Sequence, residues 1–253
     1  MKISIITLTY GHENYIKQAI ESVLMQIGDF DMEFIIANDN SPDNTDTIIR
    51  NIITTDSKAA SMIQYTKHST NLGAIANFIW ALKQCQGEYI ALCEGDDYWT
   101  DPYKLQKQVD FLEANNDYVL THHDTAVVDE NNNLLKESKL PLLYRKDFSN
   151  AELQKGISLP TLTLFFRNVF FENPVKFPNV VNGDYVLVSL LGLYGKAKYI
   201  SDIQKACYRV HTGGVWSKTS KIKKNDAKYS TLKGMSEFYF NIGNKELALH
   251  FRS

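Results

Sequence analysis

Short apolar runs alternate with amphipathic segments through the first hundred residues of this 253-residue chain. Runs rich in β-branched and aromatic residues predict buried strands at 3–9, 33–37, 62–67 and 89–93. Between them, apolar residues recur every three or four positions, which predicts helices with one buried face at 16–27, 48–53 and 75–82. This alternation predicts an α/β fold with a mostly parallel sheet and right-handed crossovers.

The second half of the chain has a less regular pattern. It predicts a helix after Pro102, a strand at 118–121, a hairpin turn at 131–133 and a loop at 141–150. Later elements are a strand at 161–166, a helix at 185–194, two short strands within 197–210 and a pair of terminal helices within 225–252. We expect the segments before and after residue 98 to form two halves of one unit.

Polar residues follow the predicted strands at the points where those strands end. They are Thr9 and Tyr10, Asp39, Asn71, and the run from Glu94 to Asp97. In open parallel sheets, ligands bind outside the carboxyl ends of the strands. The sequence therefore predicts a ligand site at this edge of the sheet.

The most unusual of these segments is Glu94-Gly95-Asp96-Asp97, which places three carboxylates after a buried strand. Such carboxylates repel one another unless a cation neutralises them. Hard oxygen ligands suit Mg²⁺ or Mn²⁺, so the segment is a candidate metal site. The alternative interpretation is an acidic turn after a strand, a common arrangement.

Composition narrows the function classes. The net charge is −2, which does not indicate a nucleic-acid partner, and no apolar run has the length of a membrane span. The chain begins with a strand-like segment rather than a signal peptide, and Cys85, Cys93 and Cys207 are far apart, so we expect free buried thiols in a cytoplasmic protein. The sequence contains neither a P-loop motif nor a G-x-G-x-x-G motif after the first strand.

The ordered motifs resemble those of the family 2 glycosyltransferases. They are T-x-T-Y-G-H-E-N-Y-I at 7–16, E-F-I-I-A-N-D-N-S-P-D-N-T at 33–45, N-L-G at 71–73, G-E-Y-I-A-L-C-E-G-D-D-Y-W at 87–99, N-G-D-Y-V-L at 182–187 and Y-R-V-H-T-G-G-V-W-S at 208–217. The resemblance implies a GT-A fold, which has a Rossmann-like sheet flanked by helices. It also implies a nucleotide-sugar-binding half at 1–98, a smaller mixed acceptor-side half at 99–217, and a basic loop with C-terminal helices at 218–253.

The same resemblance implies which residues bind the donor nucleotide sugar. They are Thr9, Tyr10, Asp39, Asn71, Gly73, Glu94, Gly95 and Asp96. A carboxylate at Asp39 suits the imide N–H of uracil. The alternatives are a turn or helix-capping role for Asp39, and an ordinary loop before a helix for Asn71 and Gly73.

For the metal, Mn²⁺ or Mg²⁺, the resemblance implies Asp96, Asp97 and His211 as ligands. Glu94 stands where the family more often has Asp and is one methylene longer. We therefore assign the direct metal contact to Asp96. Glu94 would then contact the ribose, a water or the residues that surround the metal ligands. A lone histidine after a strand is also compatible with a structural role for His211.

Asp184 matches the catalytic base of the family. In an inverting transfer, a carboxylate takes the proton of the acceptor hydroxyl while that oxygen attacks the anomeric carbon. The competing interpretation is a helix cap, because Asp184 follows Asn182-Gly183 at the start of a predicted helix.

Several other residues have two open interpretations. Tyr98, Trp99 and Trp216 can stack on a sugar or pack in the core, and His122 and His123 are either structural or acceptor-lining. The basic run 217–224 is a lid over the diphosphate, a contact for anionic lipid, or a solvated loop.

The sequence thus predicts a metal-dependent inverting transferase that moves a hexose from a UDP-sugar to a saccharide or lipid-linked saccharide, in surface polysaccharide or glycan synthesis. Peripheral contact with the inner face of the membrane is compatible with this function. Departures from the family at Asn38, Ala76-Asn77 and Glu94 leave the nucleotide base open. The rival is a catalytically silent domain that binds a sugar nucleotide. A nucleotidyltransferase would need a basic Gly-rich loop after the first strand, which 10–13 does not supply.

Overall fold

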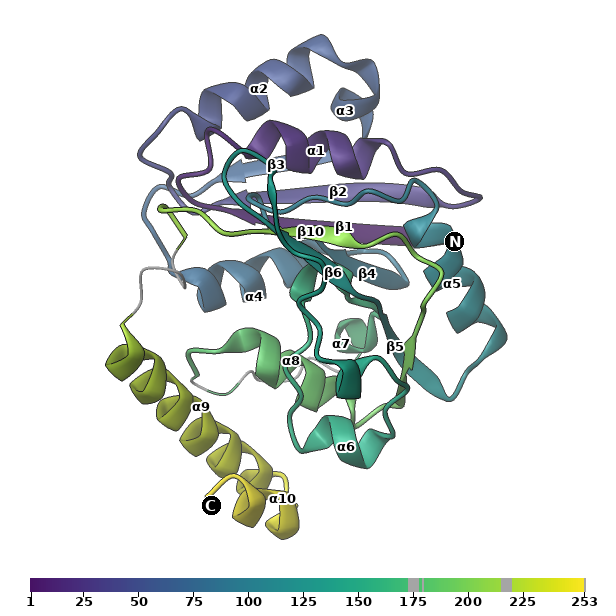
Figure 1. Cartoon of the computed structure of the whole chain (residues 1–253), viewed down its shortest axis with the longest axis vertical. Coiled ribbons are helices and arrows are strands. Elements are labelled where there is room, and N and C mark those ends of the chain that lie inside the picture. The colour runs from purple at the N-terminus through teal and green to yellow at the C-terminus, as the bar shows by residue number, and fades with distance from the viewer. Residues whose placement is uncertain (173–177, 179, 215–219, 253) are drawn as a thin grey trace.

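The computed structural model describes residues 1–172, 178, 180–214 and 220–252, and its centre is a seven-stranded sheet (Figure 1). The strand order is β3-β2-β1-β4-β8-β5-β9, and β8 alone runs antiparallel to its neighbours. The strands are β1 (Lys2–Thr9), β2 (Asp31–Asn38), β3 (Ile63–Lys67), β4 (Tyr89–Leu92), β5 (Tyr118–His122), β8 (Phe165–Arg167) and β9 (Lys196–Tyr199). The predicted mostly parallel sheet is confirmed, and both halves of the chain contribute strands to it.

Helices cover both faces of this sheet, as Figure 1 shows. One face packs against α1 (Ile16–Leu24), α2 (Thr45–Thr55) and α5 (Lys104–Ala114), and α3 (Ser57–Met62) follows α2. The other face packs against α4 (Ala74–Gln84), α6 (Asn150–Gln154), α7 (Val169–Glu172), α8 (Gly183–Leu191), α9 (Lys221–Asn241) and α10 (Lys245–His250).

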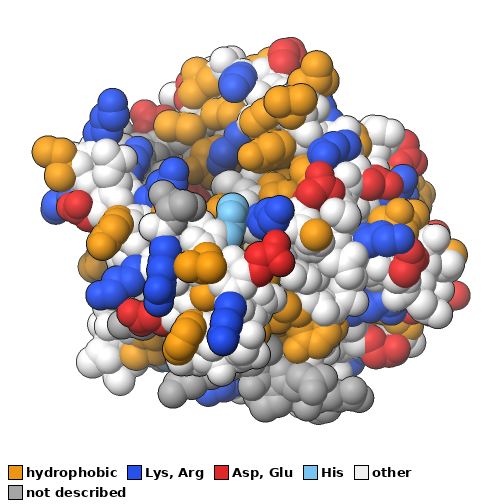
Figure 2. All heavy atoms as spheres, turned by 90° about the horizontal axis from the view of Figure 1, so that it is seen from below, with side chains coloured by type: hydrophobic (Ala, Val, Ile, Leu, Met, Phe, Trp, Pro, Cys, Tyr) orange, Lys and Arg blue, Asp and Glu red, His pale blue; other side chains and the backbone are white. Residues whose placement is uncertain are grey.

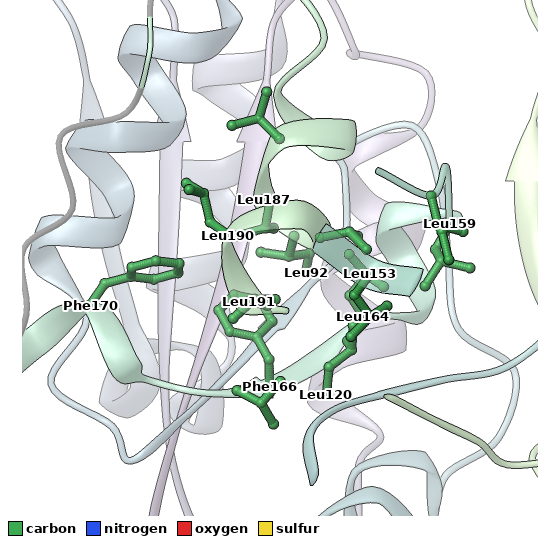
Figure 3. Close-up of a cluster of buried hydrophobic side chains, with 14 of the residues drawn as sticks. Leu92, Leu120, Leu153, Leu159, Leu164, Phe166, Phe170, Leu187, Leu190 and Leu191 are labelled. Carbon is green, nitrogen blue, oxygen red and sulfur yellow. The ribbon is translucent and has the colours of Figure 1, made fainter. Parts of the chain in front are cut away.

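The two-sided burial explains why the strands have continuous apolar runs. In β2, Phe34 and Ile36 contact the α1 side, whereas Ile35 and Ala37 contact the α4 side. Successive side chains of a strand point to opposite faces, so a strand covered on both sides buries every residue. Figure 3 shows the α8 side of this core, where Leu187, Leu190 and Leu191 meet Leu92 and Phe166.

A second, three-stranded sheet brings a late segment of the chain to the acidic turn. Its order is β10-β6-β7, with β10 (Ala206–Arg209) parallel to β6 (Thr125–Val128), and β6 antiparallel to β7 (Leu134–Lys136). The hairpin predicted between β6 and β7 is confirmed, and Asn132 in its turn has a φ of 66°. A bridge between Tyr98 and Cys207 joins β10 to the segment that follows β4. It brings residues near 210 to the acidic turn.

Some local predictions were wrong. The strand expected at 161–166 begins only at Phe165, because a 3-10 turn, η2 (Thr161–Thr163), precedes it, and the predicted loop 141–150 contains η1 (Leu142–Tyr144). Within the basic run, 221–224 belong to the first turn of α9 rather than to a loop, and the side chain of Ser220 accepts a hydrogen bond from the amide of Lys223. Trp216 and 217–219 lie outside the described residues.

The three cysteines are free and buried, as expected. In the part of the chain that the structure describes, no helix combines the length and hydropathy needed to cross a membrane. Hydrophobic and basic side chains are intermixed on the face of the molecule seen in Figure 2. The intermixing gives no support to the predicted membrane contact, which stays a prediction.

Glu33 joins the amino ends of β1 and β2 to the loop before β4. Its carboxylate accepts hydrogen bonds from the Ser4 hydroxyl at 2.5 Å and the amide of Gly87 at 3.2 Å, and forms an ion pair with Lys2. Burial opposes ionisation, but the bonds from Lys2, Ser4 and Gln86 outweigh it and lower the pKa of Glu33.

Replacing Glu33 by Gln is expected to reduce the free energy of unfolding by about 1–3 kcal/mol at neutral pH, because buried donors lose their charged partner. A lowered pKa means that this stabilisation is present above the unfolded pKa of about 4.3 and is lost as the pH falls below it. Urea unfolding of both proteins as a function of pH measures the difference, with the exposed Glu21→Gln as the matched control. A difference that persists unchanged at low pH would contradict this assignment.

Candidate active site

The candidate site lies where β1, β2 and β4 end. The sheet bonding extends past the strands themselves, since the amide of Asp39 donates to the carbonyl of Thr9 at 2.9 Å and that of Gly95 donates to the carbonyl of Leu8 at 3.0 Å. Parallel strands in register end at one edge, so Thr9, Asp39 and Gly95 become neighbours. Thr9 and Asp39 are buried, whereas Tyr10 is exposed.

Asp39 holds the loop that precedes α4. Its two carboxylate oxygens accept hydrogen bonds from the amides of Leu72 at 2.7 Å and Gly73 at 2.9 Å, and its carbonyl accepts one from the side chain of Asn71 at 3.1 Å. Gly73 has a φ of +85°, a conformation that favours glycine. The structure therefore brings together the predicted donor residues Asp39, Asn71 and Gly73, and gives Asp39 a loop-positioning role. A base contact stays a prediction, and each oxygen keeps a second lone pair for it.

The three carboxylates of the acidic turn point to different partners. Oδ2 of Asp96 lies 3.1 Å from Nε2 of His211, whereas Oδ1 of Asp97 accepts the amide hydrogen of Arg209 at 2.8 Å. Glu94 is largely buried, and within the described residues its Oε2 has no hydrogen-bond partner. The predicted pair Asp96 and His211 is therefore brought together, while Asp97 faces the backbone of β10.

The surroundings of each carboxylate set its ionisation. Burial raises the pKa of Glu94 to about 7, aided by repulsion from Asp96 and opposed by a hydrogen bond from Thr161. Burial also raises the pKa of Asp97 well above its usual value. For Asp96, burial is outweighed by the hydrogen bond from His211 and the attraction of His12, which lower its pKa. Asp96 is thus the member of the turn best suited to remain an anion.

A histidine that sequence reasoning missed completes this cluster. Candidate ligand atoms of His12, Asp96 and His211 all lie within 4.8 Å of one another. Burial lowers the pKa of His12, and the attraction of Asp96 partly offsets this effect. The sequence did contain an indication, because His12 follows the end of the first strand, at the edge where the other polar segments meet.

Asp184 lies in the first turn of α8 and is half-buried. Burial raises its pKa, while the amide groups of the helix start and the attraction of Lys139 partly counteract the rise. A carboxylate with a raised pKa is a stronger base, as proton abstraction requires. The capping interpretation also has support, since the amides of the helix start favour the ionised form of this carboxylate, and the two roles are compatible.

Lys139 connects Asp184 to the acidic turn and was also missed. Burial lowers its pKa, and the attraction of Asp97, Glu94, Asp184 and Asp96 opposes the effect. Its ammonium lies over the ring of Tyr208, 2.8 Å from the ring centroid. Lys139 is thus a cation on which Asp184 and the three carboxylates of the acidic turn all act. No motif identifies this lysine, because its neighbours come from distant segments.

Several aromatic candidates belong to the core instead. Trp99 is 2% exposed, and its indole N–H donates to the carbonyl of Leu162 at 2.8 Å. Both His122 and His123 are fully buried, and burial lowers the pKa of His122 to about 4. His122 packs between Phe148 and Tyr199. These contacts favour a structural role for Trp99 over stacking on a sugar, and a structural role for His122 over lining the acceptor site.

Gly95 allows Thr9 and His12 to approach the acidic turn. A Cβ atom at position 95 would lie 2.8 Å from Nδ1 of His12 and 2.8 Å from Oγ1 of Thr9. Thr9 is β-branched and buried, so it has little freedom to move aside.

Replacing Gly95 by Ala is therefore expected to weaken donor and metal binding by about tenfold, since ligands must be held close to their working geometry. Calorimetric titration of nucleotide and metal into the variant measures the effect. The control is Ala76→Ser on α4, which exchanges one small side chain for another away from the acidic turn. Gly11→Ala is unsuitable as a control, because Gly11 has a φ of +72°, which a residue with a side chain rarely adopts. Normal affinity in Gly95→Ala would show that this close contact is unimportant.

Comparisons with known proteins agree with this fold. The family described as glycosyl transferase family 2 matches residues 4–172. An uncharacterized protein of Mycobacterium tuberculosis (strain H37Rv) is 33% identical over 215 residues, which cover 85% of this chain and 60% of that protein. An uncharacterized glycosyltransferase of Nostoc is 29% identical over 252 residues, covering 95% of this chain and 75% of the relative.

Two solved structures have a similar fold. Staphylococcus aureus TarS 1–349 in complex with UDP-GlcNAc has a TM-score of 0.73 at 18% identity, covering all of this chain and 72% of that one. The mannosyltransferase PcManGT from Pyrobaculum calidifontis, in complex with GDP-Man and Mn²⁺, has a TM-score of 0.66 at 15% identity, covering 99% and 72%.

The fold is that of the GT-A glycosyltransferases, with a mostly parallel sheet flanked by helices. The chain belongs to glycosyl transferase family 2, as the match over 4–172 shows. It spans about 60% of the length of its mycobacterial relative.

Proposed function

We propose that the protein is a metal-dependent inverting glycosyltransferase that moves a hexose from a nucleotide-diphosphate sugar to a hydroxyl of a saccharide or lipid-linked saccharide. The observation that carries the proposal is the meeting of Asp96 and His211 at 3.1 Å. These residues are far apart in sequence and meet at the edge where β1 ends at Thr9 and where Gly95 follows β4. The family match and the GT-A fold give the same reaction class.

The donor site is formed by the segments that follow β1, β2 and β4. Asp39 holds the exposed Asn71–Gly73 loop at this edge, where the nucleotide can approach it, and Thr9 lies beside Gly95 of the acidic turn. We expect uracil as the base, and hence a UDP-sugar as the donor, because a carboxylate such as Asp39 suits a uracil imide. The TarS structure contains UDP-GlcNAc and the PcManGT structure contains GDP-Man, so an experiment must identify the nucleotide base that this protein binds.

A divalent cation fits the residues present, since Asp96 offers a carboxylate oxygen and His211 an imidazole nitrogen. When bound, Mn²⁺ or Mg²⁺ neutralises the negative charge that develops on the leaving diphosphate. Asp97 would contribute indirectly by fixing Arg209, whose guanidinium donates to the carbonyl of Asp96 at 2.9 Å. Asp184 would accept the proton of the attacking hydroxyl, opposite the leaving group.

Thermal unfolding in the presence of UDP, GDP, dTDP and CMP compounds, each with and without Mn²⁺, tests the donor site. A ligand that binds only the folded state raises the midpoint, by about 2.7 kcal/mol of stabilisation at a hundred times its dissociation constant. We expect a metal-dependent increase with UDP compounds. No increase with any nucleotide, in folded protein, would refute the proposed donor class.

Donor hydrolysis distinguishes the proposed enzyme from a catalytically silent binding domain. Asn38 and Glu94 depart from the family pattern, which favours the silent domain. The side chain of Asn38 forms hydrogen bonds with the amide of Ser41 and the hydroxyl of Tyr65 within the protein. We expect slow release of free sugar from the correct donor when metal is present. Tight binding without any hydrolysis or transfer would favour the silent domain. The acceptor, the role in surface polysaccharide synthesis and a cytoplasmic location remain part of this proposal.

A further inference from the structure

We propose that His12 is a direct metal ligand, so that two imidazoles and one carboxylate hold the cation and select Mn²⁺ over Mg²⁺. The inference rests on the proposed metal-dependent function and specifies which ion the site takes. The resemblance to the family implied Asp96, Asp97 and His211 as ligands. Among the described residues, the candidate ligand atoms that lie within 4.8 Å of one another belong to His12, Asp96 and His211.

The distances suit a single ion. Nε2 of His12 lies 3.8 Å from Oδ2 of Asp96, and Nε2 of His211 lies 3.1 Å from the same oxygen. Ligand atoms about 2.1 Å from one cation are separated from each other by roughly 3–4 Å. Asp97 is not among these clustered ligand atoms, and its Oδ1 accepts the amide hydrogen of Arg209 at 2.8 Å.

The ring of His12 is oriented as a ligand ring should be. Its Nδ1 lies 3.2 Å from the hydroxyl oxygen of Thr9, and an Nδ1–H that donates to this hydroxyl leaves the lone pair of Nε2 directed at Asp96. Metal-binding histidines are commonly fixed in this way by a second partner. His211 differs, because its Nδ1 accepts the amide hydrogen of Gly213 at 3.2 Å. Binding through its Nε2 therefore requires that the Gly213 contact is given up.

The backbone around His12 is held from the neighbouring turn after β2. Three consecutive amides donate to side chains of that turn, namely Gly11 to Ser41 at 3.1 Å, His12 to Thr45 at 3.0 Å and Glu13 to Asp43 at 2.9 Å. The carbonyl of His12 accepts the amides of Tyr15 and Ile16, both at 2.9 Å, before α1. The dense polar turn seen in the sequence therefore fixes His12 before any ligand arrives.

The ligand set determines the preferred ion. Imidazole nitrogen binds transition ions better than it binds Mg²⁺, which prefers oxygen ligands and retains its waters. A site with two imidazoles and one carboxylate accordingly favours Mn²⁺, and leaves open positions for the oxygens of a diphosphate. With only one imidazole, the site would discriminate less between the two ions.

Electron paramagnetic resonance of Mn²⁺ tests the inference without nucleotide or turnover. The sharp spectrum of free Mn²⁺ reports the bound fraction, and competition with Mg²⁺ gives the ratio of affinities. We expect His12→Gln to weaken Mn²⁺ binding by about 10- to 100-fold and to change Mg²⁺ binding much less. The matched control, His250→Gln on α10, should bind both ions like the wild type. The melting temperature of each variant shows whether it is folded.

Isotope-labelled histidine supplies a second measurement, which does not need a folded His12→Gln variant. Nitrogen couplings to bound Mn²⁺ should show two histidines in the wild type, and Thr9→Val should weaken Mn²⁺ binding while His12 is retained. Coupling to one histidine, an unchanged Mn²⁺ to Mg²⁺ ratio in His12→Gln, or no Mn²⁺ binding would each overturn the role of His12. Metal-dependent sugar transfer together with any of these results would leave the proposed function intact. Two-histidine coupling without transfer or donor hydrolysis would refute the function alone.

Discussion

Replacing Asp184 by Asn is expected to reduce kcat by about 10²- to 10⁴-fold, the usual contribution of a general base. The variant keeps the size of the side chain and an acceptor oxygen for the amides of the first turn of α8, but it cannot take a proton. Binding of the donor and metal should change little, because the structure places Asp184 near Lys139 rather than among the metal-ligand candidates. Initial rates and donor titrations on the same protein measure the two effects separately.

The capping interpretation of Asp184 makes a different prediction. Loss of a favourable charge in the first turn of a helix costs about 0.3–1 kcal/mol of stability and has no specific effect on chemistry. Glu246→Gln, in the first turn of α10, is the matched control and should show this loss with normal kcat. If Asp184→Asn behaves like this control, the residue caps α8 and another group is the base.

Replacing Asp96 by Asn is expected to abolish measurable Mn²⁺ binding and to reduce kcat by about 10²- to 10³-fold, as loss of a preorganised electrostatic partner does. Asp96 is the anion shared by both histidines, with Oδ2 at 3.1 Å from His211 and 3.8 Å from His12. Paramagnetic resonance and initial rates measure these effects.

Asp97→Asn separates a direct from an indirect role in the same turn. The amide oxygen of Asn can still accept the hydrogen bond from Arg209, so this variant should retain Mn²⁺ binding close to that of the wild type. Strong loss of metal in Asp97→Asn, with the fold preserved, would restore Asp97 as a ligand. Retained metal in Asp96→Asn would refute the proposed centre of the site.

The regular part of the fold was predictable because its pattern is local. Strands buried on both faces require continuous apolar runs, and their helices require apolar residues every three or four positions, so β1–β4 and α1, α2 and α4 follow from the sequence alone. The 3-10 turn at Thr161–Thr163 was missed, since Leu162 and Thr163 are buried by distant segments and their composition resembles that of a strand.

The acidic turn shows how much of the site the sequence alone can predict. Its position after a buried strand predicted a cation site, and the family motifs implied Asp96 and His211, which the structure brings together. The three carboxylates look equivalent in sequence. Their roles differ only because Asp96 faces two histidines, Asp97 faces the backbone of β10 and Glu94 is buried without a partner for Oε2 among the described residues.

The sequence by itself determined the order of elements, the edge of the sheet where ligands bind and the reaction class implied by its motifs, because these depend on residue type and spacing. Only the tertiary structure decided that His12 joins Asp96 and His211, and that four carboxylates act on Lys139. These contacts join segments up to about two hundred residues apart. No local pattern encodes them, because they arise from strand pairing, above all from the bridge between Tyr98 and Cys207 that brings β10 to the acidic turn.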